Sequence, residues 1–248
     1  LTAAEQRQWQ QQLVTADFLH PFDTLKTQYS ANELQAIVQK VSAIPSAPRF
    51  FADGRAVTAE DYRNWQQQMA VSKGNTTITV QYALVTRRAN VRRFPTMELL
   101  TNSSLDPDLD RLQETGLFVG QWLQVLHYSQ DRQWAFVVTE HYRGWMQVTD
   151  FAVTDRQTIA KFLANPQRLT VTGAKVQTNV TPELPSVSAV SLDMGVKLPL
   201  LPTPDTLVNG QHPSFSYVVQ LPTRAADGRL QLFPALIARH HDVQVAAL

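Results

Sequence analysis

The chain has 248 residues, 44% of them hydrophobic and 17% charged, with a formal net charge of +1 and no cysteine. That charge balance argues against a nucleic-acid partner, which needs a basic surface, and against electrostatic attraction to anionic membranes. The lack of cysteine excludes a disulfide, a cysteine-based zinc site and a thiol nucleophile within these residues. No apolar run approaches the roughly 18 residues of a membrane-spanning helix.

The first 75 residues are predicted to form a helical segment. Three stretches combine a Ser or Thr at the N-cap position with an acidic residue shortly after it and apolar residues at helical spacing. They begin at Thr2, Ser30 and Thr58 and end near His20, Val41 and Met69. Three short helices bury little apolar surface by themselves, so we expect this segment to pack on another part of the chain.

After residue 75 the hydrophobic pattern alternates, which is typical of β strands. The clearest strands are short runs of β-branched and aromatic residues that begin with tryptophan and are separated by polar turns. They are Trp122–Leu126, Trp134–Val138 and Trp145–Val148, and we assign Thr77–Val80, Gln81–Thr86 and Asn90–Arg93 to the same small barrel. An acidic, turn-rich insertion interrupts the barrel between Asn102 and Asp110.

A second set of strands is predicted beyond residue 154, after a short helix capped by Asp155. The strands are expected from Arg168 onward, at Val187–Leu192, Val196–Leu201, Phe215–Gln220 and Leu230–Ala235. The pair Asp227-Gly228 predicts a two-residue hairpin turn. The residues from 241 to 248 have the composition of the start of a linker.

Motifs that would identify a catalytic or metal site are missing from the sequence. It has no G-x-S-x-G, P-loop, G-x-G-x-x-G or HExxH pattern. His240 and His241 are adjacent, so on a strand their rings would face opposite ways and could not share a metal ion. Asp106, Asp108 and Asp110 could chelate a hard cation, but the loop lacks the central Gly and terminal Glu of a calcium loop. We expect neither a metal nor a cofactor.

The strongest candidate for a binding site is a groove of aromatic and polar side chains in the first barrel. Tyr142 precedes Arg143 at a predicted turn, where a phenol is presented to solvent. Glu114 lies in a neighbouring polar stretch, and Trp145 and Arg143 could line the same groove. A barrel also needs tryptophan in its core, so the alternative interpretation of these aromatic residues is structural.

Two long stretches resemble one protein family. The run VTRRANVRRFPT…DRLQETGLFVGQWLQVLHYSQDRQWAFVVTEHYRGWMQV is similar to the first SH3-like domain of NlpC-type peptidoglycan cysteine peptidases. The run VTGAKVQTNVTPELPSVSAVSLDMGVKLPLL is similar to their second SH3-like domain, and the helical opening resembles their N-terminal stabilising segment. The resemblance therefore implies a mainly β fold with a helical N-terminal segment and two small SH3-like barrels in tandem.

The implied domain boundaries are 1–75 for the helical segment, 76–153 for the first barrel, 154–240 for the second, and 241–248 for the start of a linker. The family's papain-like catalytic domain, with its D-C-S-G motif, has no counterpart in this sequence. Catalysis is therefore carried over to no residue. We expect the chain to be the non-catalytic part of a hydrolase, with that catalytic domain as its partner.

In the family, the first SH3-like domain narrows the active-site cleft and uses a Tyr and an acidic residue to recognise the free amine of L-Ala. The matching positions are Tyr142 and Glu114, so the resemblance implies a peptidoglycan stem peptide as ligand and cleavage of its γ-D-glutamyl–diamino acid bond by the parent enzyme. It also implies export to the periplasm or cell envelope, with a lipoprotein as one form. Two alternatives stay open: a stand-alone wall-binding module and a structural protein-interaction module.

Overall fold

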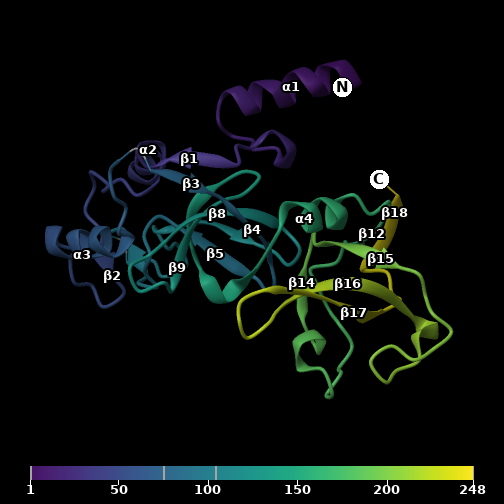
Figure 1. Cartoon of the computed structure of the whole chain (residues 1–248). Helices are drawn as coiled ribbons and strands as arrows, with labels where there is room; N and C mark the ends of the chain where they lie inside the picture. Colours follow the sequence, from purple (N-terminus) through teal and green to yellow (C-terminus); the bar gives the residue numbers. More distant parts are fainter. Residues whose placement is uncertain (1, 75, 104, 248) are drawn as a thin grey trace. The chain divides into compact units, whose positions relative to one another are not determined.

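The computed structural model describes residues 2–74, 76–103 and 105–247 and shows a mainly β protein (Figure 1). The chain divides into two compact units. The first unit comprises residues 1–80, 90–116 and 123–147, and the second comprises residues 81–89, 117–122 and 148–248. Whether the units correspond to two tandem SH3-like barrels with the predicted boundaries stays a prediction.

The three helices predicted for the first unit are confirmed. They are α1 (Ala3–Thr15), α2 (Ala31–Val41) and α3 (Ala59–Met69). Each begins with a capping box, in which the N-cap hydroxyl accepts a hydrogen bond from the third helical amide and the side chain of that residue accepts one from the N-cap amide. In α3 the acidic partner of Thr58 is Asp61. These reciprocal bonds satisfy backbone donors that a helix start otherwise leaves open.

Five strands of the first unit follow the order β8-β9-β10-β5-β7 in one sheet. Their bounds are Trp122–Tyr128 (β8), Trp134–Val138 (β9), Arg143–Gln147 (β10), Ala89–Arg92 (β5) and Gln113–Leu117 (β7). The three tryptophan-containing strands of the prediction are thus present and form consecutive antiparallel neighbours. A register shift between Val125 and His127 marks a bulge in β8.

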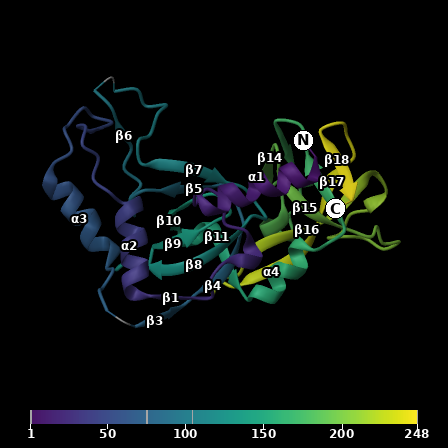
Figure 2. The same cartoon turned by 90° about the horizontal axis from the view of Figure 1, so that it is seen from above.

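The helical segment packs on this sheet, as expected, because α2 contacts β10 (Figure 2). Leu34 and Val38 are buried apolar residues of α2, on one face of the helix. A short 3-10 helix, η1 (Phe22–Thr24), lies between α1 and α2. The face of α2 opposite the core remains available to line a surface.

Two short strand pairs complete the first unit. β1 (Gln28–Ser30) pairs with β3 (Thr77–Thr79), and β2 (Phe50–Phe51) pairs with β6 (Leu100–Thr101). The assignment of Thr77–Val80 to the barrel was therefore wrong, because this strand pairs with a segment before α2. Only the middle residue of this three-residue strand is partly buried, and such a short pattern does not predict which strand it pairs with.

The second unit contains a five-stranded sheet in the order β17-β16-β15-β12-β18. The bounds are Gln167–Val171 (β12), Lys197–Leu201 (β15), Ser216–Arg224 (β16), Leu230–Ala238 (β17) and Val243–Ala247 (β18). It also holds the antiparallel pair of β4 (Gln81–Val85) with β11 (Phe151–Thr154). A second antiparallel pair joins β13 (Lys175–Gln177) to β14 (Ser191–Asp193). The unit also contains the helix α4 (Arg156–Leu163). The predicted cap of α4 is confirmed, since Asp155 accepts a hydrogen bond from the amide of Thr158 at 2.8 Å.

Three features of the second unit differ from prediction. Residues 243–247, expected in a linker, form β18 and pair with β12 over its whole length. The hairpin between β16 and β17 is present, but its loop is longer than two residues, because the last pair in register is Arg224 with Leu230. His240 and His241 lie in the turn between β17 and β18 and not on a strand.

Three further 3-10 helices, η2 (Val148–Asp150), η3 (Pro185–Val187) and η4 (Pro213–Phe215), lie in the second unit. Within residues 2–74, 76–103 and 105–247, no helix has the length and apolar character needed to span a bilayer.

Candidate functional site

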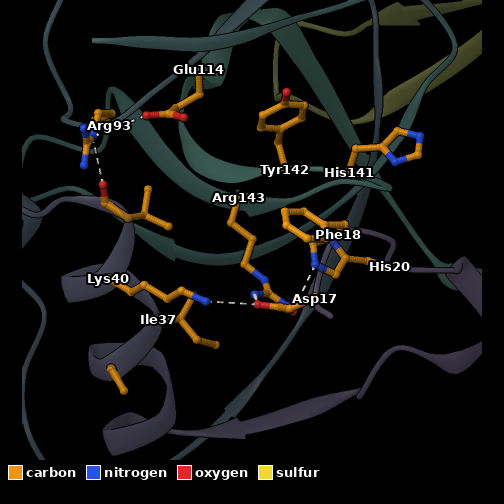
Figure 3. A pocket seen from close by; sticks show the side chains of 12 residues that line it. Asp17, Phe18, His20, Ile37, Lys40, Arg93, Glu114, His141, Tyr142 and Arg143 are labelled. Carbon is orange, nitrogen blue, oxygen red and sulfur yellow. Dashed lines mark hydrogen bonds and ion pairs between the residues drawn. The ribbon is translucent and has the colours of Figure 1, made fainter. Parts of the chain in front are cut away.

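One pocket of about 520 Å³ opens within the first unit (Figure 3). It is built from the segment after α1, the outer face of α2, the ends of β5 and β7, and the turn from β9 into β10. Its lining residues are Asp17, Phe18, His20, Ala36, Ile37, Lys40, Val41, Arg93, Glu114, His141, Tyr142 and Arg143. Three of the four predicted site residues, Tyr142, Glu114 and Arg143, therefore lie in the same pocket.

Ionic contacts converge on Asp17 at one side of this pocket. Arg143 donates two hydrogen bonds to the carboxylate, at 2.6 Å and 2.7 Å, in a bidentate arrangement. Lys40 reaches the same carboxylate at 3.5 Å and His20 Nε2 lies 3.3 Å from it. The hydrogen bonds from Arg143 are the main reason that the pKa of Asp17 falls from 3.8 to about 2, against a smaller opposing effect of burial.

The turn that carries Tyr142 is anchored to the same segment. The amide of His20 donates to the carbonyl of Glu140 at 2.7 Å, and His20 Nδ1 lies 2.9 Å from the carbonyl of Thr139. Thr139 closes the turn, because its hydroxyl accepts from the Tyr142 amide and donates to the Tyr142 carbonyl, both at 3.0 Å. These bonds fix the backbone from which the Tyr142 side chain projects.

Glu114 lies on the other side of the pocket, next to Arg93 (Figure 3). Arg93 Nε is 3.3 Å from Glu114 Oε1 and also donates to the carbonyl of Val41, at the end of α2, at 3.1 Å. A cation at the C-terminus of a helix is favoured by the helix dipole. The Arg93 guanidinium is thereby held between helix and carboxylate, and it orients Glu114 toward the pocket.

Tyr142 presents an exposed phenol ring, with 42% of the residue accessible. Its hydrogen bonds are made by the backbone, and within the described residues the hydroxyl has no partner. Phe18, at 67% exposure, is a second exposed aromatic residue of the pocket. Ligand pockets combine aromatic side chains with a few placed polar groups, and this pocket has both.

Trp145, the fourth predicted site residue, was placed wrongly in the groove. It is fully buried, and its indole Nε1 donates to the hydroxyl of Ser42 at 3.2 Å. Its ring packs edge-on against Phe136 at 5.5 Å between centroids. Arg143 and Trp145 are two residues apart on β10, so they lie on the same face of the strand. Trp145, however, is at the centre of β10, where α2 and its C-cap Ser42 cover it. Its role is in the core.

Several residues that line the pocket carry no functional signal in the sequence. Asp17, Lys40 and Arg93 lie far from Tyr142 along the chain. Asp17 and Lys40 are single charged residues without a motif, and Arg93 follows Arg92 in a short basic run. Asp17 has a φ of 64°, a left-handed conformation that Asp and Asn adopt more readily than other non-glycine residues. Only the packing of the helical segment on the sheet brings these charges together.

The acidic insertion at residues 102–110 supplies a structural carboxylate. Asp110 pairs with the buried Arg92 at 2.6 Å and accepts hydrogen bonds from the amides of Leu100 and Leu112. Its oxygens are therefore engaged in fixing the backbone around β6. Among the described residues, the one group with the ligands and spacing of a metal site is instead His240, His241 and Asp242.

Comparison with known proteins identifies one segment of the chain. Residues 101–147, which include Glu114 and Tyr142, match the family model of the SH3 domain (SH3b1 type). No curated protein matches the chain.

Two proteins of the NlpC/P60 type are among the solved structures that are similar to the chain. A novel NlpC/P60 endopeptidase from Photobacterium damselae subsp. piscicida aligns over 100% of this chain and 53% of its own, with a TM-score of 0.65 and 15% identity. An NlpC/P60 family protein from Bacillus cereus aligns over 67% of this chain and 56% of its own, with a TM-score of 0.46 and 17% identity. The chain thus spans about half the length of the Photobacterium protein. It contains an SH3b-type domain and shares its fold with part of the Photobacterium endopeptidase.

Proposed function

We propose that this chain is the non-catalytic, substrate-restricting and scaffolding part of a cell-wall peptidase that resembles γ-D-glutamyl-diamino acid endopeptidases. Its pocket receives the amino end of a peptidoglycan stem peptide. The observation that carries the proposal is that Tyr142 and Glu114, the two residues implied by the family resemblance, line one pocket. Both offer oxygen acceptors there, which is the chemistry that an ammonium group requires.

The two acceptors are suited to an ammonium group because neither is fully used within the protein. In the described residues, the Tyr142 hydroxyl is without a hydrogen bond, and the ion pair of Glu114 with Arg93 involves Oε1 and leaves Oε2 open. A free L-Ala amine carries a positive charge and three donors. An acylated amine carries no charge and one donor, so it would leave Glu114 Oε2 or the Tyr142 hydroxyl desolvated without a partner, which costs binding free energy.

The anchoring of these side chains supports a role in selectivity. Arg93 fixes Glu114 through its second bond to the end of α2, and Thr139 fixes the turn that carries Tyr142. Pre-organised groups discriminate better, because less ordering entropy is lost on binding. The pocket also holds the cations Lys40 and Arg143, which suit a ligand that carries a carboxylate beside its amine.

The chemical step would belong to another part of the enzyme. The chain has no cysteine, so the nucleophile of a cysteine peptidase would come from a papain-like catalytic domain as partner. The likeness to about half of an NlpC/P60 endopeptidase supports such a division of labour. With peptidoglycan as its substrate, the protein would act in the periplasm or cell envelope.

A stand-alone wall-binding module is the second candidate function. It is favoured by the fact that all residues lining the pocket belong to the first unit of this chain. Such a module would bind its ligand without a catalytic partner. The two candidates therefore differ in the affinity that this chain shows by itself.

The test is a titration of the isotope-labelled chain with L-Ala-γ-D-Glu-diaminopimelate, followed by amide NMR. A substrate-restricting part holds only one end of the peptide, so we expect a Kd on the order of 1 mM or weaker. The shifted amides should be those of residues 139–143, Glu114 and the end of α2. The N-acetylated peptide, as the matched control, should shift them much less.

The outcomes separate the candidates. Micromolar affinity for the free peptide would favour the stand-alone module. Equal shifts with free and acetylated peptide, or shifts confined to residues outside the pocket, would overturn the proposed recognition of the amine.

A further inference from the structure

The turn between β17 and β18 brings two imidazoles and one carboxylate together. His240 Nδ1 lies 3.4 Å from Asp242 Oδ2, and His241 Nε2 lies 3.4 Å from Asp242 Oδ1. All the donor atoms lie within 4.8 Å of one another. We propose that His240, His241 and Asp242 form a surface site for a divalent transition-metal ion of the zinc class.

The spacing of the donor atoms suits such an ion. Zinc binds imidazole nitrogen and carboxylate oxygen at about 2.0–2.2 Å in tetrahedral geometry, which places neighbouring ligand atoms roughly 3.4 Å apart. Each imidazole has a nitrogen at this distance from one oxygen of Asp242, His240 from Oδ2 and His241 from Oδ1. With all ligand atoms within 4.8 Å of one another, both imidazoles and the carboxylate can face one ion.

The orientation of His240 also favours metal binding. Its Nδ1 accepts a hydrogen bond from the backbone amide of Asp242 at 3.3 Å, so this nitrogen carries a lone pair and no proton beside the Asp242 carboxylate. A neutral imidazole with its lone pair turned inward is the form that coordinates a metal. The hydrogen bond is long, and coordination of an ion can replace it.

The backbone holds Asp242 in place. Its carbonyl accepts hydrogen bonds from the amides of Thr172, at 2.7 Å, and Gly173, at 3.1 Å. Gly173 has no side chain, and a Cβ built at this position would overlap the carboxylate of Asp242. The absence of a side chain at Gly173 therefore leaves space for the Asp242 carboxylate next to the two imidazoles.

The donor set selects the class of ion. Two imidazole nitrogens and one carboxylate oxygen suit zinc, nickel and copper, whereas calcium and magnesium prefer oxygen ligands throughout. Three protein ligands leave at least one coordination position for water or for a carboxylate of another molecule. His241 is highly exposed, with 91% of its side chain accessible, so that position faces solvent.

The experiment is calorimetric titration of the chain with ZnCl₂, with the histidine ring resonances followed by NMR. We expect one ion per chain, with shifts at His240 and His241. His241→Gln and Asp242→Asn should each weaken zinc binding about tenfold or more. Loss of a residue that only hydrogen-bonds to a metal ligand already costs about 10–100-fold in affinity, and loss of a ligand itself costs more. His212→Gln, which removes an exposed histidine of the same unit, is the matched control and should leave the affinity unchanged.

A fourth variant tests the geometry without removing a ligand. Gly173→Ala should displace the Asp242 carboxylate and lower zinc affinity while both histidines remain, with circular dichroism confirming the fold. A titration with CaCl₂ is the control for the ion. The site would be overturned if CaCl₂ gave the same binding heat and histidine ring shifts as ZnCl₂, or if zinc affinity were unchanged in both His241→Gln and Asp242→Asn. Equal losses in His212→Gln would show unspecific histidine binding and have the same consequence.

Discussion

The carboxylate of Asp17 and the guanidinium of Arg143 form a bidentate ion pair between residues 126 positions apart in sequence. The pair joins the segment after α1 to the start of β10, directly beside Tyr142 (Figure 3). Asp17 is itself surrounded by Lys40 and His20. This contact ties the helical segment to the pocket and orients the pocket's cationic side.

Replacing Asp17 by Asn should destabilise the chain by about 1 kcal/mol, because Arg143 loses its anionic partner while solvent partly screens the pair. Asn tolerates the left-handed backbone of this position, so the change acts on the charge and not on the turn. Urea unfolding at neutral pH measures the difference. Asp205→Asn, at an exposed position, is the control, and an equal cost in both variants would contradict the role of the ion pair.

The contribution of Asp17 should depend on pH in a defined window. Its pKa is about 2 in the folded protein against 3.8 in a free chain, first because of the hydrogen bonds from Arg143. A lowered folded pKa means that the stabilisation is complete above 3.8 and is lost as the pH falls through about 2. The difference in unfolding free energy between the wild type and Asp17→Asn should thus be constant above this window and shrink within it. A difference that grows on acidification would contradict the assignment.

Ser42→Ala should cost about 1–3 kcal/mol, since it leaves the buried indole N–H of Trp145 without its acceptor. The hydroxyl of Ser42 also donates to the carbonyl of Arg93 at 2.6 Å. A double-mutant cycle with Trp145→Phe isolates the bond between the two side chains. If the two substitutions are additive in urea unfolding, Trp145 does not depend on Ser42.

Gly144→Ala should destabilise the first unit by about 1–3 kcal/mol through overpacking. A Cβ at this position would lie 2.6 Å from Val91 Cγ1 and 2.7 Å from the carbonyl of Arg92, where β10 meets β5. Gly195→Ala is the comparison, because a Cβ there meets nothing within 4 Å and only its φ of 88° opposes the change. Thermal unfolding should show the larger loss for Gly144→Ala, and the reverse order would refute crowding as the reason for this glycine.

Local signals in the sequence predicted the elements well. The hydroxyl and carboxylate spacing at Thr2 and Ser30 predicted α1 and α2, because a capping box needs only four consecutive residues. The runs that begin with tryptophan predicted β8, β9 and β10, because the composition of a strand is also a property of a few consecutive residues. The prediction that residues 77–79 join the barrel was wrong, because strand pairing depends on residues that are distant in sequence.

The candidate site was predictable in part. Resemblance to a family placed Tyr142 and Glu114 in one site, and the structure brings both to one pocket. Trp145 was misplaced because alternation along a strand does not show which positions another element covers. The prediction that His240 and His241 face opposite ways held only for a strand, and the two residues lie in a turn. Asp17 joins the site only through tertiary packing.

The central claim is that Tyr142 and Glu114 recognise a free amine. Its most direct test is the ratio of affinities for the free and the N-acetylated stem peptide, measured by NMR titration in the wild type, Tyr142→Phe and Glu114→Gln. We predict a ratio well above one in the wild type that falls toward one in both variants, because each loses an acceptor for the ammonium group. A ratio near one in the wild type, or an unchanged ratio in both variants, would contradict the account.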